Sequence, residues 1–191
     1  MNFETLKTKI NEELGMLEHK FIILVNMEPE HHTDSVLEIV KFMTDREMGG
    51  IYITSLNPYH YMKRTFKEYH INAKNLFFID LLSCMAGSTP EMKDGCAFIE
   101  TPAALEEIGF WVNKLMQKID AENKFLIIDS FSTLLIYNNH AAVEEFNKSL
   151  IDEMRRMQSI SVFASTSTDL ENRNDFYTEL AKLCDRMIKF D

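Results

Sequence analysis

The sequence predicts an α/β protein with a mainly parallel β-sheet covered by helices on both faces. Short apolar runs recur along the 191-residue chain, and most do not alternate with polar residues, which is typical of strands buried on both faces. Amphipathic stretches with helical periodicity separate these runs. The alternation of the two patterns is that of successive βαβ units, which build parallel sheets.

The apolar runs predict six strands. In chain order they are Lys20–Val25, Gly50–Thr54, Leu76–Asp80, Lys124–Asp129, Ser161–Ser165 and Arg186–Phe190. We expect Phe21–Val25 and Phe125–Asp129 in the interior of the sheet, since these two runs are the most apolar.

The amphipathic stretches predict helices around residues 36–43, 58–69, 105–119, 143–157 and 175–183. A leading helix over residues 1–18 carries Phe3, Leu6, Ile10 and Leu17 on one side. The stretch Ser83–Thr101 shows neither periodicity and contains Gly87, Pro90 and Gly95, so we expect a long irregular loop there.

Length and composition exclude several classes of protein. A chain of 191 residues predicts a single domain over residues 1–191. The longest apolar runs are far too short to span a membrane, and the N-terminus lacks a signal-peptide core, so we expect a cytoplasmic protein. The net charge of −10 makes nucleic acid an unlikely partner. The three cysteines show no CxxC pair, so we expect reduced thiols.

The first strand-to-helix junction has the frame of a phosphate-binding P-loop, GxxxxGK[ST]. On this frame Asn26 and His31 take the glycine positions, His32 takes the lysine position, and Thr33 is the hydroxyl residue. Three of the four defining positions therefore differ from the pattern.

These differences remove the physical basis of phosphate binding. His31 adds a side chain where the backbone must approach phosphate closely, and His32 lacks the permanent positive charge of a lysine. Glu28 and Glu30 add negative charges that would cost about 1 kcal/mol or more per close contact with a triphosphate. We predict no tight ATP binding in the usual mode.

A second candidate site follows the fourth strand, where four apolar residues precede Asp129 and Ser130. In Walker B motifs such an aspartate holds Mg²⁺. Any central strand can also end in Asp-Ser, because both residues cap the next turn. This segment alone therefore leaves both interpretations open.

Four segments together resemble the KaiC-like branch of the RecA-type ATPases over nearly the whole chain. They are Gly49–Ser83, Glu100–Leu115, Phe125–Leu135 and Leu183–Asp191, and the third resembles the family's Walker B stretch. The resemblance implies a three-layer α/β/α RecA-like domain. It also implies a catalytic glutamate just after the second strand, where this chain has Ser55, Leu56, Asn57 and Pro58.

The loss of both the phosphate loop and the catalytic carboxylate suggests a non-catalytic pseudo-ATPase that acts as a regulatory or protein-interaction module. Asn26, His31, His32, Thr33, Asp129 and Ser130 would be a vestigial nucleotide site, with no cofactor expected. An alternative is an atypical Mg-dependent nucleotide-binding ATPase that uses Asp129 and Thr33. A third hypothesis is a metal-binding protein that uses the His31-His32 loop.

The resemblance also implies self-association, since RecA-type domains of this family commonly form rings with ATP between neighbours. Here the nucleotide is expected to be absent, and the charge of −10 on each copy adds repulsion. The apolar face of the leading helix must be buried, either on its own sheet or in a dimer contact. We therefore expect a monomer or a dimer in preference to a hexamer.

Overall fold

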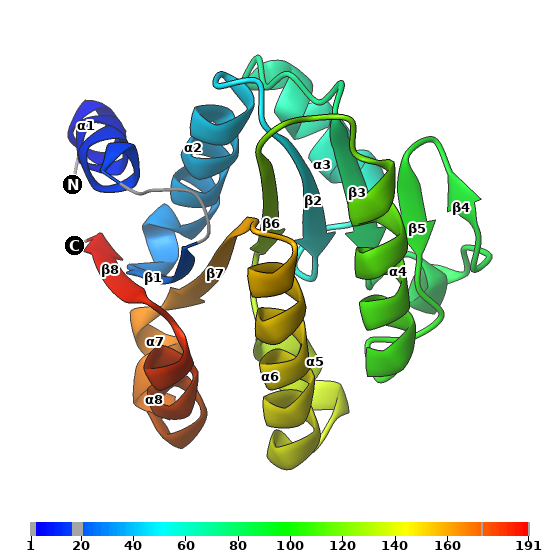
Figure 1. The fold of residues 1–191 in the computed structure, drawn as a ribbon. Helices are drawn as coiled ribbons and strands as arrows, with labels where there is room; N and C mark the ends of the chain where they lie inside the picture. Colours follow the sequence, from blue (N-terminus) through cyan, green and yellow to red (C-terminus); the bar gives the residue numbers. More distant parts are fainter. Residues whose placement is uncertain (1–2, 17–20, 173, 191) are drawn as a thin grey trace.

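The computed structural model places residues 3–16, 21–172 and 174–190 in a three-layer α/β/α arrangement (Figure 1). One eight-stranded sheet forms the middle layer, in the order β4-β5-β3-β2-β6-β7-β1-β8. All neighbouring strands are parallel except the β4–β5 pair. The predicted fold class is therefore confirmed.

The six predicted strands are all present. They are β1 (Ile22–Met27), β2 (Gly49–Thr54), β3 (Leu76–Asp80), β6 (Lys124–Ile128), β7 (Ile160–Thr166) and β8 (Arg186–Phe190). β1 lies between β7 and β8, and β6 lies between β2 and β7. Both strands expected in the interior are thus interior, because an apolar strand must be covered on both faces and both edges.

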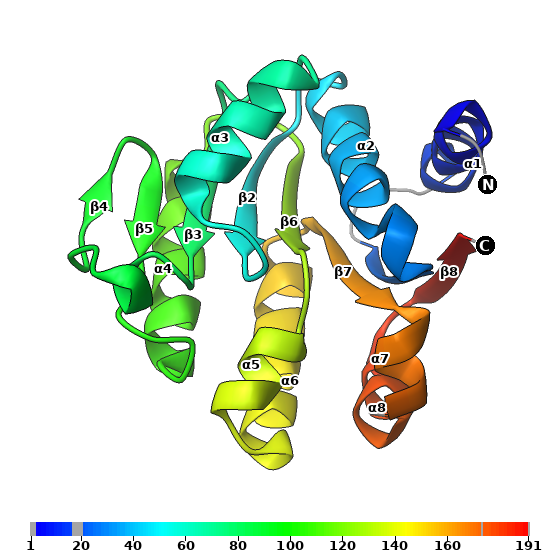
Figure 2. The same cartoon turned by 180° about the vertical axis from the view of Figure 1, so that it is seen from behind.

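The longer helices connect the strands. They are α1 (Phe3–Gly15), α2 (His32–Thr44), α3 (Tyr59–Glu68), α4 (Leu105–Lys118), α6 (His140–Arg156) and α8 (Asn174–Leu183). Two short helices lie near the ends of β6 and β7: three residues separate β6 from α5 (Ser132–Tyr137), and α7 (Ser167–Asn172) follows β7 directly. α4, α6 and α8 cover the face seen in Figure 1, and α1, α2 and α3 cover the opposite face seen in Figure 2.

Each face of the sheet has its own apolar core. On the α2 face, Val25, Ile127 and Val162 of neighbouring strands pack with side chains of α1, α2 and α3. On the α4 face, Leu24 and Leu126 pack with side chains of α4, α6 and α8. Alternate residues of one strand thus enter opposite cores, which explains why the apolar runs are continuous.

The leading helix packs on its own chain. Leu6, Ile10 and Leu14 of α1 are buried in the core that includes α2 and β8. Glu13 of the helix forms an ion pair of 2.6 Å with Arg186 of β8. Of the two ways to bury this face, the structure adopts the intramolecular one. Leu17 and Lys20, which the sequence assigned to the leading helix and the first strand, lie outside the described residues.

The stretch Ser83–Thr101 differs from its prediction as a long irregular loop. It contains the 3-10 turn η2 (Cys84–Ala86) and two short strands, β4 (Met92–Lys93) and β5 (Cys96–Phe98). β5 pairs in parallel with β3, and β4 pairs antiparallel with β5, so the segment extends the sheet at one edge. Strands of two and three residues are too short to produce a recognisable periodicity.

Within the described segments, none of the helices combines the length and the apolar composition needed to cross a bilayer.

Candidate functional site

The connection between β1 and α2 is shorter than the sequence frame suggested. Asn26 and Met27 belong to β1, where they pair with Ser165 and Thr166 of β7. Only Glu28 and the 3-10 turn η1 (Pro29–His31) separate the strand from the helix. The expected strand end at Val25 is therefore wrong by two residues, because the ladder to β7 and β8 continues to Met27.

Backbone hydrogen bonds within this connection hold it in a tight turn. The His31 amide donates to the Glu28 carbonyl at 2.9 Å, and the His32 amide donates to the Pro29 carbonyl. The Glu28 carboxylate accepts a hydrogen bond of 3.0 Å from the Ser167 hydroxyl of α7. Two amides that a P-loop would direct at phosphate are thus engaged within the turn.

His32 and Asp129 approach each other at the carboxyl edge of the sheet. His32 is the first residue of α2, and Asp129 directly follows β6. Both side chains are buried, and the His32 side chain acts electrostatically on the Asp129 carboxyl. His32 Nε2 has no hydrogen-bond partner among the described residues. The residue at the lysine position of the P-loop frame thus lies within electrostatic range of Asp129.

The Asp129 carboxylate is held by groups from β2 and the residue after it. Oδ1 accepts hydrogen bonds from the Ser55 amide at 2.8 Å and from the Ser55 hydroxyl at 2.6 Å. Oδ2 lies 3.3 Å from the Tyr52 hydroxyl and 3.4 Å from the Thr54 hydroxyl. Both carboxylate oxygens therefore have protein partners.

Burial and hydrogen bonding act on Asp129 in opposite directions. Burial raises the pKa of its carboxyl, because the charged form loses its hydration. The hydrogen bonds from Ser55, the nearby His32 and the Tyr52 hydroxyl all lower it. Burial is the larger effect, so the pKa of Asp129 lies above its usual value.

A second buried carboxylate, Asp80 at the end of β3, accepts hydrogen bonds from backbone amides. It accepts hydrogen bonds from the amides of Tyr59, Leu82 and Ser83, at 2.7, 2.7 and 2.9 Å. The Ser83 hydroxyl donates to it at 2.5 Å. Since Tyr59 is the first residue of α3, Asp80 fixes where this helix begins.

The remaining candidate residues are distributed around this centre. The Ser130 hydroxyl accepts from the Ser132 amide at 3.0 Å, and the Ser130 carbonyl lies 2.8 Å from the Ser55 hydroxyl. Thr33 is exposed and His31 is half-buried, and neither makes the contacts to Asp129 described above. Asn26 is buried, and its Nδ2 has no hydrogen-bond partner among the described residues.

No three His, Cys, Asp or Glu side chains come close enough to hold a metal ion together within residues 3–16, 21–172 and 174–190. The two histidines of the His31-His32 pair differ in exposure, since His32 is buried and His31 is half-buried.

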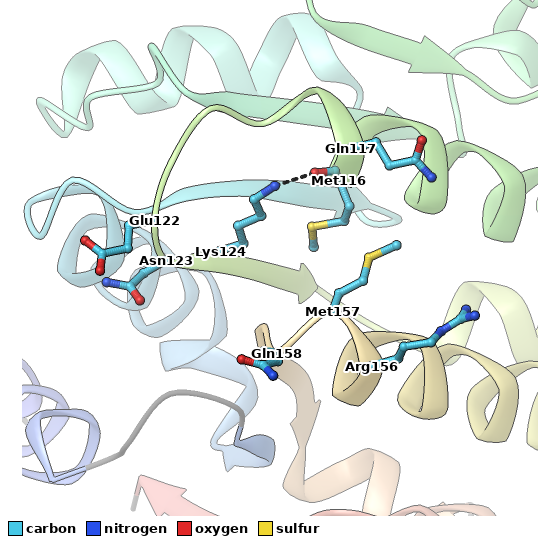
Figure 3. Close-up of a pocket in the computed structure, with 8 residues that line it drawn as sticks. All are labelled: Met116, Gln117, Glu122, Asn123, Lys124, Arg156, Met157 and Gln158. Carbon is cyan, nitrogen blue, oxygen red and sulfur yellow. Dashed lines mark hydrogen bonds between the residues drawn. The ribbon is translucent and has the colours of Figure 1, made fainter.

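The cavities lie away from this centre. One of about 570 Å³ opens at the amino edge of the sheet, between the ends of α4 and α6 (Figure 3). There the Lys124 ammonium donates to the Met116 carbonyl at 2.9 Å. A larger groove of about 960 Å³ runs between α4 and α6. Neither is lined by Asp129, Ser55 or His32.

Sequence reasoning missed the partners of Asp129. In the sequence, Ser55 stands out only as a position that lacks the expected catalytic glutamate. In the structure it makes the two shortest hydrogen bonds to Asp129. The signal available was a hydroxyl residue at a strand end, but its use required knowing that β2 lies next to β6. Tyr52 gave no signal, because an aromatic residue in a strand is ordinary core.

No family model matches the chain, and no curated protein matches it. Solved structures do. An uncharacterized protein from Pyrococcus horikoshii, crystallised with an unknown peptide, matches with a TM-score of 0.73 at 10% identity, over 95% of this chain and 82% of that one. Flagellar accessory protein FlaH from Methanocaldococcus jannaschii matches with a TM-score of 0.65 at 11% identity, over 99% of this chain and 77% of FlaH.

A KaiC-like protein from Pyrococcus horikoshii also matches, with a TM-score of 0.58 at 11% identity. The match covers 81% of this chain and 64% of the KaiC-like protein, so the chain spans less than two thirds of its length. At these identities the likeness concerns the fold. The chain has the RecA-like fold of the KaiC-like protein and of FlaH.

Proposed function

We propose that this protein is a pseudo-ATPase: a RecA-like domain that does not hydrolyse ATP and acts as a regulatory or protein-interaction module. The observation that carries the proposal is the connection from β1 to α2. It is a tight 3-10 turn whose His31 and His32 amides are bonded to Glu28 and Pro29. A phosphate cradle needs these amides free and turned toward the ligand.

Charge supports the same conclusion. Glu28 precedes the turn and Glu30 lies within it, and a histidine stands where a P-loop has a permanently charged lysine. Each carboxylate close to a bound triphosphate would cost about 1 kcal/mol even in well-hydrated surroundings. The turn therefore repels the ligand that a P-loop attracts.

The surroundings of Asp129 support the absence of hydrolysis. Its Oδ1 accepts two hydrogen bonds from Ser55, so direct coordination of a cation by this oxygen would have to displace them. The residues after β2 are Ser55, Leu56 and Asn57, none of which can act as a carboxylate base for an attacking water. An interaction role is in keeping with the Pyrococcus horikoshii neighbour, which was crystallised in complex with a peptide.

Calorimetric titration with ATP, with and without Mg²⁺, tests the proposal. We expect no binding in the micromolar range and no phosphate release over many hours. The Asp129→Asn variant is the matched control, since it keeps the Oδ1 acceptor for Ser55. Micromolar affinity, or turnover that Asp129→Asn abolishes, would establish instead the atypical Mg-dependent ATPase that uses Asp129 and Thr33.

The metal-binding alternative has its own test. The His31-His32 loop would bind a divalent transition metal only with further ligands. Metal analysis of the purified protein, before and after dialysis against a chelator, should give less than stoichiometric metal. One tightly held equivalent that is lost in His31→Ala would favour a metal-binding protein over the pseudo-ATPase.

A further inference from the structure

The groove between α4 and α6 is a candidate docking surface for another protein. Both helices connect parallel strands, so they run in the same direction side by side across one face of the sheet (Figure 1). The space between them measures about 960 Å³. We call it the α4–α6 groove; its apolar lining comprises Leu105, Gly109 and Val112 of α4 with Ala142, Phe146 and Leu150 of α6.

The floor of the groove is apolar, and its partly accessible surface comes from half-buried side chains such as Phe146. Val112 and Leu150 lie at the bottom and are buried, while Phe146 is half-buried against them. Gly109 leaves the wall open: a Cβ at this position would meet only Phe146 Cε2, at 3.9 Å. The hydrogen bond of 2.8 Å from Asn113 to Glu153 connects the two helices toward the amino edge. The groove is therefore a trough with an apolar base between two walls.

The walls of the groove are acidic. Four glutamates line it, at Glu106 and Glu107 on α4 and at Glu145 and Glu153 on α6, and no Lys, Arg or His lines it. Glu153 is paired with Arg156, whereas no ion pair involves the other three among the described residues. The groove thus combines an apolar floor with a net negative rim.

The dimensions match a short helix. The lining runs from Leu105 to Asn113 on α4 and from Ala142 to Glu153 on α6, about 12–16 Å at 1.5 Å per residue. That length takes about three turns of a helix with apolar side chains at i, i+3, i+4 and i+7. The groove is open to solvent along its length, which suits a peptide better than an enclosed small molecule.

We propose that the α4–α6 groove binds a basic amphipathic helix of a partner protein, with its apolar side chains on Leu105, Ala142 and Phe146 and its Lys or Arg side chains against Glu106, Glu107 and Glu145. The inference rests on the proposed interaction role and names its surface and partner chemistry. A second copy of this chain is the wrong occupant, because each copy carries a net charge of −10. Nucleic acid is excluded by the same sign of charge.

Three variants make the proposal testable. Gly109→Leu fills the groove with a side chain and replaces glycine by a better helix former, so the variant should fold. Glu145→Lys reverses a rim charge. Asp152→Lys is its matched control, since Asp152 is also exposed on α6 but does not line the groove.

The probe is a fluorescent 14-residue peptide with Leu at helical positions i, i+3, i+4 and i+7 and Lys elsewhere, followed by anisotropy at low and physiological salt. We expect Gly109→Leu to weaken binding about tenfold and Glu145→Lys about fivefold, and Asp152→Lys to change it less than about twofold. In NMR spectra the amides of Gly109, Ala142 and Ser149 should shift on titration.

Equal affinity of all three variants would overturn the proposal, because binding would then be a diffuse charge effect. So would the absence of binding at millimolar peptide. Self-association that Gly109→Leu abolishes would assign the groove to a second copy and also overturn it. The result is separable from the pseudo-ATPase proposal, since peptide binding is measured without nucleotide and ATP titration is measured without peptide.

Discussion

Ser55 donates two hydrogen bonds to one oxygen of Asp129, from its amide at 2.8 Å and from its hydroxyl at 2.6 Å. The pair joins the ends of β2 and β6, two neighbouring strands in the middle of the sheet. The Ser55 hydroxyl also lies 2.8 Å from the Ser130 carbonyl. Asp129 therefore has a structural role at the carboxyl edge of the sheet, independent of any ligand.

Replacing Asp129 separates its hydrogen bonding from its charge. Asp129→Ala leaves the Ser55 amide and hydroxyl without their acceptor in a buried place, so we expect a loss of about 2–5 kcal/mol in the free energy of unfolding. Asp129→Asn keeps the Oδ1 acceptor and offers an amide to the Tyr52 and Thr54 hydroxyl oxygens, so its loss at pH 7 should be within about 1 kcal/mol. Urea denaturation measures both.

The wild type and the Asp129→Asn variant together test the predicted pKa shift of Asp129. Burial raises the pKa of Asp129 in the folded state, so the folded protein holds this proton more tightly than the unfolded chain does. The contribution to stability is complete below the ordinary pKa of 3.8 and is lost as the pH rises through the folded-state pKa. Wild-type stability, measured against Asp129→Asn, should fall over the pH range that begins above 3.8. A rise over this range would contradict the assignment.

The leading helix should contribute to the stability of the single chain. Ile10 of α1 is 1% exposed, so Ile10→Ala should lower the free energy of unfolding by about 2–5 kcal/mol. Met16 is 70% exposed, and Met16→Ala should have almost no effect. Thermal unfolding at several protein concentrations measures both. Unchanged monomer stability with a weakened dimer would show that the helix serves an interface instead.

Assembly is predicted to be independent of nucleotide. The proposal that the turn at Glu28–His31 does not bind phosphate implies that no nucleotide joins neighbouring copies, and copies with a charge of −10 repel one another, so we expect a monomer or a dimer with and without ATP. Light scattering at several salt concentrations measures the mass. A hexamer that forms only on addition of nucleotide would refute both this prediction and the pseudo-ATPase proposal.

Asn147 is expected to reduce stability. Its side chain on α6 is 1% exposed, and neither its Oδ1 nor its Nδ2 has a partner among the described residues. It borders a space of about 50 Å³ between α6 and α8, next to Phe176 and Leu180. Asn147→Leu should therefore raise the free energy of unfolding by about 1 kcal/mol, because it removes two unsatisfied polar atoms and fills space.

Asn147→Asp is the comparison for that substitution. It has nearly the same shape but adds a buried charge, so it should destabilise the fold at pH 7. If Asn147→Leu proves as destabilising as Asn147→Asp, the amide has a structural function that its contacts do not reveal.

The central elements were predictable because their signal is local. Continuous apolar runs marked β1, β2, β3, β6, β7 and β8, and each run is set by burial on both faces of one sheet. The short strands β4 and β5 were not predicted, since β5 is defined by its pairing with β3 and β4 by its pairing with β5, and neither has a pattern of its own. The extension of β1 to Met27 was not predicted either, because it depends on pairing with β7 and β8.

The sequence by itself determined that Asp129 stands at a strand end and that His32 stands where a P-loop has lysine, because both depend on counting along the chain. Only the tertiary structure decided what these residues touch. Ser55 and Asp129 are 74 positions apart in the sequence, and they meet because β2 is the neighbour of β6 in the sheet. β1, in contrast, is separated from β6 by β7. Strand order is fixed by packing over the whole sheet, so no local pattern contains it.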